Sequence, residues 1–161
     1  MMLERNIPID EIIFCDTGKE FDEMYRHIDK VEKHISRPII RLKAKHSFDY
    51  YMFNHIKTKG KAKGQKGYGW ATMQNRWCTT MLKHDLAERY AKKKYGTEIK
   101  WYEGIAVDEP LRIKEKNYPL ADWNITEKEA LYYCYEKGFD WEGLYKLFDR
   151  VSCWCCPLQN L

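Results

Sequence analysis

The chain has 161 residues, of which 44% are hydrophobic and 15% aromatic, and this composition excludes an intrinsically disordered protein. No run approaches the roughly 20 apolar residues that cross a bilayer, and residues 1–6 lack the apolar run of a secretory signal. The net charge of +4 is modest. We therefore expect a cytoplasmic globular protein with no membrane partner.

The first elements predict a βαβ unit with a parallel sheet. Residues 11–15 form a short apolar run that a turn at 16–18 ends, which is typical of a buried strand. Apolar side chains then recur at three- and four-residue steps, as one face of a helix requires: Phe21, Met24, Tyr25, Ile28, Val31 and Ile35. Pro38 ends this helix, and residues 39–42 can form the next strand.

The rest of the chain continues as one α/β domain spanning residues 1–161. Thr126 and Glu129 form a capping box, so a helix should begin there and end at Gly138. Neither an internal repeat nor a linker is present in the sequence. Between the βαβ unit and this helix we expect a short helix over 48–56, a helix over 79–95 and a strand over 99–107.

The beginning of the chain differs from a complete doubly wound fold. In such a fold a first strand and a glycine-rich phosphate turn precede the first helix. Here residues 1–5 resemble the tail of that helix and lead directly into the strand at 11. We therefore expect that the first strand and its phosphate loop are missing, that the chain is truncated, and that an unpaired sheet edge favours a homodimer.

Asp16, Thr17 and Gly18 follow a parallel strand, at the edge where open α/β sheets bind ligands. A carboxylate there can accept hydrogen bonds from a ribose or an adenine amine, and a glycine lets a ring approach the backbone. The alternative is a simple turn in which Asp16 or Thr17 caps the following helix.

Cysteines mark a candidate metal site near the C-terminus. In a cytoplasmic protein, clustered cysteines are metal ligands or catalytic thiols more often than disulfides. Cys153 and Cys156 form a C-x-x-C pair, Cys78 precedes a predicted helix, and Cys155 is a weaker candidate because neighbouring side chains usually point apart. Four thiolates suit zinc or a 4Fe-4S cluster, and a redox dithiol or free buried thiols are the alternatives.

Two further segments carry charges suited to anions. Arg76 and Lys83 flank Cys78 and could hold an anionic substrate. The segment from Gly104 to Arg112 runs out of the late predicted strand, and beyond the strand end Asp108, Glu109 and Arg112 could bind a ribose, Mg²⁺ or a phosphate, or form only a charged surface turn.

Residues 57–66 read KTKGKAKGQK, with five lysines and two glycines. Such a segment is typical of a solvated, mobile loop. The sharper alternative is a flexible cover attracted to phosphates, either on a nucleotide or on a nucleic-acid backbone.

Taken in order, these motifs resemble the phosphoadenosine phosphosulfate (PAPS) reductase family of adenine nucleotide alpha-hydrolase-like proteins. The resemblance covers nearly the whole chain. The matching segments are Asp16-Thr17-Gly18, Glu20-Phe21, Arg76-Trp77-Cys78 with Lys83, Gly104 to Pro110, Pro119 to Trp123, and Ser152 to Pro157.

The resemblance implies a Rossmann-like parallel sheet flanked by helices and a set of site residues. By this resemblance Asp16, Thr17 and Gly18 would line an adenosine pocket, and Arg76, Lys83 and Arg112 would face phosphates or sulfate. Gly104 and Glu109 belong to the same nucleotide site. The implied cofactor is an iron–sulfur cluster or zinc, held by Cys78, Cys153, Cys156 and, as a substitute fourth ligand, Cys155, with Mg²⁺ accompanying the nucleotide.

Three departures from the family pattern limit the activity that this chain can have by itself. The Ser-Gly-Gly-Lys-Asp-Ser phosphate loop and the C-terminal catalytic cysteine segment are missing, and Ala106 and Pro110 replace an arginine and a serine. We therefore expect a fragment or an inactive homologue of an enzyme that reduces a sulfonucleotide or cleaves an adenine nucleotide between its α and β phosphates. The alternatives are sulfur insertion into nucleic acid bound by the lysine-rich loop, and a non-catalytic metal-stabilised nucleotide-binding module.

Overall fold

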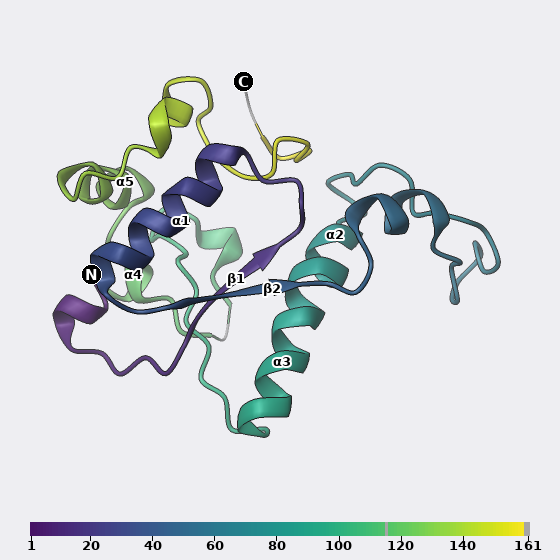
Figure 1. The fold of residues 1–161 in the computed structure, drawn as a ribbon, viewed down its shortest axis with the longest axis horizontal. Coiled ribbons are helices and arrows are strands. Elements are labelled where there is room, and N and C mark those ends of the chain that lie inside the picture. The colour runs from purple at the N-terminus through teal and green to yellow at the C-terminus, as the bar shows by residue number, and fades with distance from the viewer. Residues whose placement is uncertain (115, 160–161) are drawn as a thin grey trace. The chain divides into compact units, whose positions relative to one another are not determined.

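The computed structural model describes residues 1–114 and 116–159 and shows a mixed α/β protein with a small parallel sheet flanked by helices (Figure 1). The chain divides into two compact units, one of residues 1–10 and 95–140 and the other of residues 11–94 and 141–161. The prediction of a single domain over 1–161 stays a prediction. Within the described residues, no helix combines the length and apolar character needed to cross a bilayer.

The larger unit contains the predicted βαβ unit. Strand β1 (Ile12–Asp16) leads into helix α1 (Asp22–Ile35), and strand β2 (Ile39–Lys43) returns parallel to β1. In the register of the pair, Ile12 lies opposite Ile39 and Asp16 opposite Lys43. Both strands therefore end at the same edge of the sheet.

The segment after β2 forms a helical lobe of the same unit. A π-type turn η2 (Tyr50–Asn54) follows β2, and a continuous helical stretch is built from α2 (Trp77–Thr79), the π-type turn η3 (Thr80–His84) and α3 (Asp85–Tyr95). A 3-10 segment η5 (Trp141–Lys146) packs against α1. The helices predicted over 48–56 and 79–95 are confirmed.

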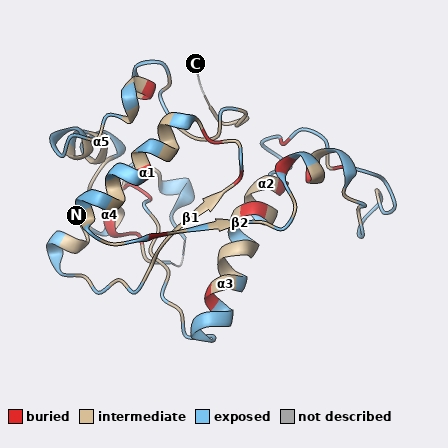
Figure 2. Ribbon diagram, in the orientation of Figure 1, coloured by how far each residue is buried: buried red, intermediate tan, exposed pale blue. Residues whose placement is uncertain are grey.

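Buried side chains of this lobe form a mainly aromatic core, part of which is visible as the red patches on α2 and η3 (Figure 2). Cys78 and Cys155 are partly buried against it. Burial of such large rings supplies most of the stabilisation of a small domain. The core residues are Phe48, Tyr51, Ala71, Trp77 and Leu82.

The smaller unit consists of short helices and loops. It comprises η1 (Leu3–Arg5), η4 (Pro110–Arg112), α4 (Pro119–Asp122) and α5 (Glu127–Glu136). The predicted capping box is confirmed, because the Thr126 side chain accepts from the Glu129 amide while the Glu129 carboxylate accepts from the Thr126 amide.

The predicted strand over 99–107 is wrong. Tyr102 makes one isolated parallel bridge to Asn117, and the amide of Ile105 donates to the carbonyl of Glu103 at 3.0 Å. A hydrogen bond between residues two apart closes a tight turn, which interrupts an extended strand. The sheet among the described residues thus has two strands, and the Rossmann-like architecture stays a prediction.

Gly67 is a position where only glycine fits. It has φ +66°, and a Cβ at this position would lie 2.3 Å from the carbonyl oxygen of Met52. Gly60 has a similar φ of +72° but open space around its Cβ position. We expect Gly67→Ala to lower the free energy of unfolding by about 2 kcal/mol more than Gly60→Ala, because overpacking adds to the shared backbone strain.

Urea unfolding followed by tryptophan fluorescence measures this difference. Equal unfolding free energies for the two variants would show that the approach of Gly67 to Met52 is not required.

Candidate functional site

A pocket of about 400 Å³ lies where β1 and β2 end. One wall is the turn after β1, Asp16 to Lys19, and the other is the segment after β2, Lys43 to Asp49, with Leu82 between them. The parallel register explains this arrangement, because it brings the carboxyl ends of both strands to one edge. Asp16, Thr17 and Gly18 are therefore brought together at a pocket, as expected.

Basic side chains outnumber acidic ones in the pocket lining. The lining contains Lys19, Lys43 and Lys45 and two carboxylates, those of Asp16 and Asp49. The Lys19 ammonium lies 2.9 Å from an Asp49 carboxylate oxygen and 5.6 Å from the centre of the Phe48 ring. A concave surface with an excess of positive charge fits a ligand that carries an anionic group.

Asp16 is held in place by two hydrogen bonds to the same oxygen, Oδ1. The Gly18 amide donates to it at 2.8 Å and the Tyr25 hydroxyl at 2.7 Å, while Oδ2 lies 3.6 Å from the Lys43 ammonium. Burial alone would raise the pKa of Asp16, but these donors and Lys43 outweigh it and hold the pKa below its usual value. Burial and the bond to Asp16 raise the pKa of Tyr25.

The alternative interpretation of the Asp16–Gly18 turn as a helix cap is wrong. Helix α1 begins at Asp22, and Phe21 precedes it with no side-chain hydrogen bond to the helix. Gly18 instead has φ +72°, with no atom within 4 Å of the position that a Cβ would take. The backbone of the turn is therefore open to a ligand on this side.

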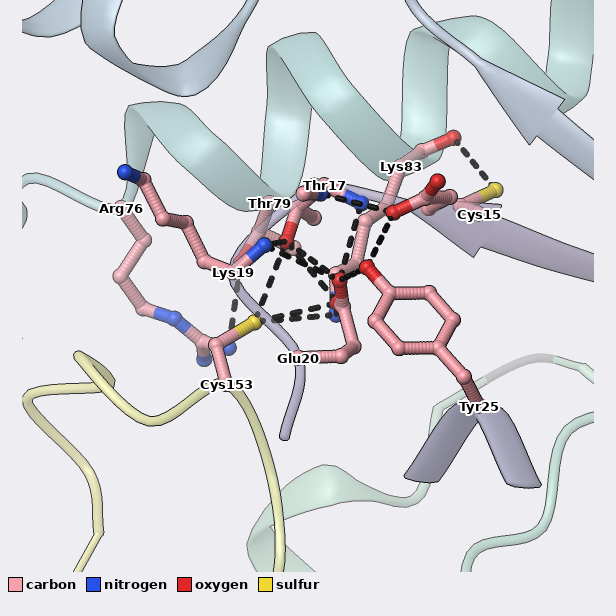
Figure 3. Close-up of polar contacts among 11 residues, drawn as sticks. Cys15, Thr17, Lys19, Glu20, Tyr25, Arg76, Thr79, Lys83 and Cys153 are labelled. Carbon is pink, nitrogen blue, oxygen red and sulfur yellow. Dashed lines mark hydrogen bonds and ion pairs between the residues drawn. The ribbon is translucent and has the colours of Figure 1, made fainter. Parts of the chain in front are cut away.

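Glu20 is the centre of the polar network beside the pocket (Figure 3). Its side chain is 4% exposed and accepts hydrogen bonds from the Thr17 amide at 3.1 Å and from the Thr17 hydroxyl at 2.9 Å. The Cys153 thiol donates to Oε1 at 3.3 Å, and the Lys83 ammonium lies 3.9 Å from the same oxygen. One carboxylate thus joins the β1 turn, the helical stretch after α2 and the C-terminal segment.

Cys153 and Lys83 contact both the Glu20 carboxylate and each other. The Cys153 sulfur is 3.9 Å from the Lys83 ammonium and 3.5 Å from the Thr17 hydroxyl. Burial raises the pKa of Cys153 to about 11, although Lys83 and Thr17 partly offset it. In this environment the Cys153 thiol is protonated at neutral pH.

The π-type turn η3 lies against β1. The carbonyl of Lys83 lies 3.6 Å from the Cys15 sulfur, which donates to it. In a π-type turn the backbone hydrogen bonds are displaced by one residue, and such turns are frequent at functional sites. Through the bond from the Cys15 thiol to the Lys83 carbonyl, this turn contacts the strand that ends in Asp16.

The four cysteines predicted as metal ligands do not form one donor set in this arrangement. Cys155 lies close enough to Cys78 and Cys156 for their charges to contribute to its raised pKa, after burial as the main cause. The Cys153 sulfur points instead to Glu20. Across residues 1–114 and 116–159, no three His, Cys, Asp or Glu side chains are placed to hold a metal ion. The iron–sulfur cluster or zinc stays a prediction.

Arg76 lies outside the pocket wall. It precedes α2, and its guanidinium lies 3.3 Å from the Thr79 hydroxyl, to which it donates. Its exposed position leaves the guanidinium accessible to an anion.

Gly104, Glu109 and Arg112 belong to the smaller unit. The Arg112 guanidinium pairs with the Glu109 carboxylate, and the Ala106 amide donates to Glu109 at 3.3 Å. Asp108 accepts from the first amide of α5 at 3.0 Å. These side chains build the local turn, and their predicted roles toward nucleotide or Mg²⁺ stay predictions.

Sequence reasoning missed several residues of the site. The sequence pattern singles out Glu20 only as part of the Glu20-Phe21 pair, and Tyr25 only as part of a helix face. The pocket wall from Lys43 to Asp49 could have been predicted from the sequence. These residues directly follow β2, and in a parallel pair they lie beside the turn that follows β1.

The chain is similar to two archaeal proteins, and no family model matches it. Both are uncharacterized proteins of Methanocaldococcus jannaschii. MJ0066 is 24% identical over 173 residues, covering 94% of this chain and 31% of that protein, and MJ0973 is 26% identical over 161 residues, covering 91% and 35%. The chain thus spans about a third of the length of these curated relatives.

Replacing the central carboxylate tests the network. We expect Glu20→Gln to lower the free energy of unfolding by about 1–3 kcal/mol, because an amide nitrogen would face the Thr17 and Lys83 donors and leave them unpaired. Glu23→Gln removes the same charge from an exposed pair with Arg26 and should cost less than about 1 kcal/mol. Chemical denaturation at neutral pH measures both. Similar losses for the two variants would contradict a central role for Glu20.

Proposed function

We propose that this chain is the nucleotide-binding part of a PAPS reductase-like enzyme with a Rossmann-like fold. In this proposal the pocket between Asp16–Lys19 and Lys43–Asp49 holds an adenine nucleotide or sulfonucleotide. The reaction served is sulfonucleotide reduction or cleavage between the α and β phosphates. The observation that carries the proposal is the position of the pocket at the carboxyl ends of two parallel strands.

Different residues of the pocket walls are suited to the nucleoside and to the phosphate or sulfate groups of a nucleotide. Asp16 keeps Oδ2 available beside Lys43, so this oxygen can accept a hydrogen bond from a ribose hydroxyl or an adenine amine. The open backbone at Gly18 offers a surface that a flat ring can approach. Lys43 and Lys45 are exposed and can bind phosphate or sulfate as point charges.

The size of the pocket is consistent with this ligand class. Small-molecule pockets usually measure about 300–1,000 Å³, so about 400 Å³ lies at the lower end of that range. A mononucleotide is a suitable occupant. The side chains that provide specificity are few and come from both walls.

A cysteine-bound metal is a separate prediction, and the proposed nucleotide binding does not depend on it. Cys78, Cys153, Cys155 and Cys156 supply sulfur donors of the kind that bind zinc or iron–sulfur clusters. None of these cysteines lines the proposed nucleotide pocket. Metal and acid-labile sulfide content of protein purified without oxygen tests this: iron with sulfide supports a cluster, and no bound metal contradicts the cofactor prediction.

Removing the pocket lysines tests the nucleotide proposal. We expect adenosine 5′-diphosphate and 3′-phosphoadenosine 5′-phosphate to bind, and Lys43→Ala/Lys45→Ala to weaken both by about 10-fold or more through loss of two phosphate contacts. Isothermal titration calorimetry measures the dissociation constants.

The matched control is Lys92→Ala/Lys93→Ala, which removes two exposed lysines from α3 outside the pocket. It should leave nucleotide affinity unchanged. Absence of binding by the unaltered chain, or equal losses in the two double variants, would contradict the proposal.

A further inference from the structure

The segment from Tyr50 to His84 has a charge unlike that of the rest of the chain. It contains six lysines and one arginine and no aspartate or glutamate. Because the whole chain has a net charge of only +4, the remainder is net acidic. Such a concentration of one sign on one segment attracts polyanions.

The lysine-rich part of this segment is a formed hairpin, which we call the lysine hairpin (residues 57–66). Ile56 and Lys66 make an antiparallel bridge, the Lys57 amide donates to Gln65 at 2.9 Å, and the Gly64 amide donates to Lys57 at 2.8 Å. A turn in which the Lys63 amide donates to Gly60 closes the end. The sequence alone had favoured a mobile loop.

The base of the lysine hairpin is anchored to the helical lobe. The amide of Gly67 donates to His55 at 2.8 Å, that of Tyr68 to Tyr51 at 3.0 Å, and that of Gly69 to Met52 at 3.0 Å. The lysines are therefore presented from a fixed support. Four of them are exposed: Lys59, Lys61, Lys63 and Lys66.

Exposed rings flank the hairpin on both sides in the sequence. Phe53 is 59% exposed and Trp70 is 49% exposed. Trp70 lies edge-on to the buried Phe48, at 6.4 Å between ring centres, so the core supports it from one side. Exposed rings beside a run of lysines are the combination that single-stranded nucleic-acid sites use, with rings for base stacking and lysines for phosphates.

Stacked rings connect the hairpin with the lobe beneath it. His55 stacks on Tyr68 at 5.0 Å between centres, Tyr68 stacks on Trp77 at 5.8 Å, and the Lys57 ammonium lies 6.0 Å from the Tyr68 ring. Trp77 belongs to the buried core. This stack connects the base of the lysine hairpin to the buried core of the lobe.

We propose that this surface binds single-stranded nucleic acid, with the lysine hairpin contacting phosphates and Phe53 and Trp70 stacking on bases. Unpaired bases present free faces to aromatic side chains, whereas the bases of a duplex are already stacked on one another. The chemistry therefore favours a single strand over a duplex. Binding here does not require that the pocket at Asp16 holds a nucleotide.

Fluorescence anisotropy with a labelled thymidine oligonucleotide of about 20 nucleotides tests the proposal. We expect Lys59→Ala/Lys61→Ala/Lys63→Ala to weaken binding at least about 10-fold and to reduce the slope of log affinity against log salt by about 2, since each lost phosphate contact contributes about 0.7. Phe53→Ala/Trp70→Ala should weaken binding by about 10- to 100-fold with little change in slope, because stacking is not ionic.

Two control variants separate this surface from general charge and from the pocket. Lys33→Ala/Lys92→Ala/Lys93→Ala removes the same charge from exposed positions on α1 and α3 and should weaken binding far less than the hairpin variant. Lys43→Ala/Lys45→Ala, which impairs the proposed nucleotide pocket, should retain oligonucleotide binding. Circular dichroism and thermal unfolding confirm that every variant is folded.

Three results would overturn the proposal. The first is equal weakening by the hairpin variant and the helix variant. The second is binding of a duplex as tight as that of the single strand, with no effect of the Phe53→Ala/Trp70→Ala substitutions. The third is failure to bind the oligonucleotide while an acidic polypeptide such as poly-glutamate binds, which would assign the surface to a protein partner.

Discussion

The buried Glu20 carboxylate is the constraint on which the site depends. Three segments that are distant in the sequence meet at it: the turn after β1, the helical stretch that carries Lys83, and the C-terminal segment with Cys153. A carboxylate with so little exposure is stable only when donors surround it, and here both the amide and the hydroxyl of Thr17 do so. The position of the pocket wall at Asp16–Lys19 follows from this network.

The same unit combines two features suited to phosphate-bearing ligands. The pocket at the strand ends is concave and mixes lysines, carboxylates and the Phe48 ring, which suits one small ligand. The lysine hairpin carries charge of one sign and is flanked in the sequence by the exposed rings of Phe53 and Trp70, a combination that suits an extended polyanion. Phe48 belongs to the pocket wall and also supports Trp70, so the two features share part of one core.

Elements with strong local signals could be predicted from the sequence. The helix at 22–35 follows from its apolar period, and the α5 cap follows from Thr126 and Glu129 alone. The strand predicted over 99–107 failed because strand formation depends on a partner, and the Ile105–Glu103 turn prevents pairing along its length. The turn Asp16–Gly18 was a candidate because it follows a parallel strand, and the structure places it at a pocket.

The remaining parts of the site depend on contacts between distant residues. Glu20 near a helix start is typical of a residue that interacts with the helix dipole, and nothing local indicates that Cys153 donates to it from 133 positions away. The C-x-x-C spacing predicted that Cys153 and Cys156 share a metal, whereas the fold directs Cys153 to Glu20 and places Cys155 near Cys78. Side-chain direction in a turn is decided by tertiary packing, which spacing alone does not encode.

The pocket at the carboxyl ends of β1 and β2 is proposed to recognise an adenine nucleotide, and amide chemical-shift mapping with adenosine 5′-diphosphate tests this most directly. Nucleotide binding at this pocket should give saturable shifts that concentrate in residues 16–19 and 43–49, with the hairpin amides of residues 57–66 unchanged. Shifts confined to the hairpin, or no saturable shift at the two strand ends, would contradict it.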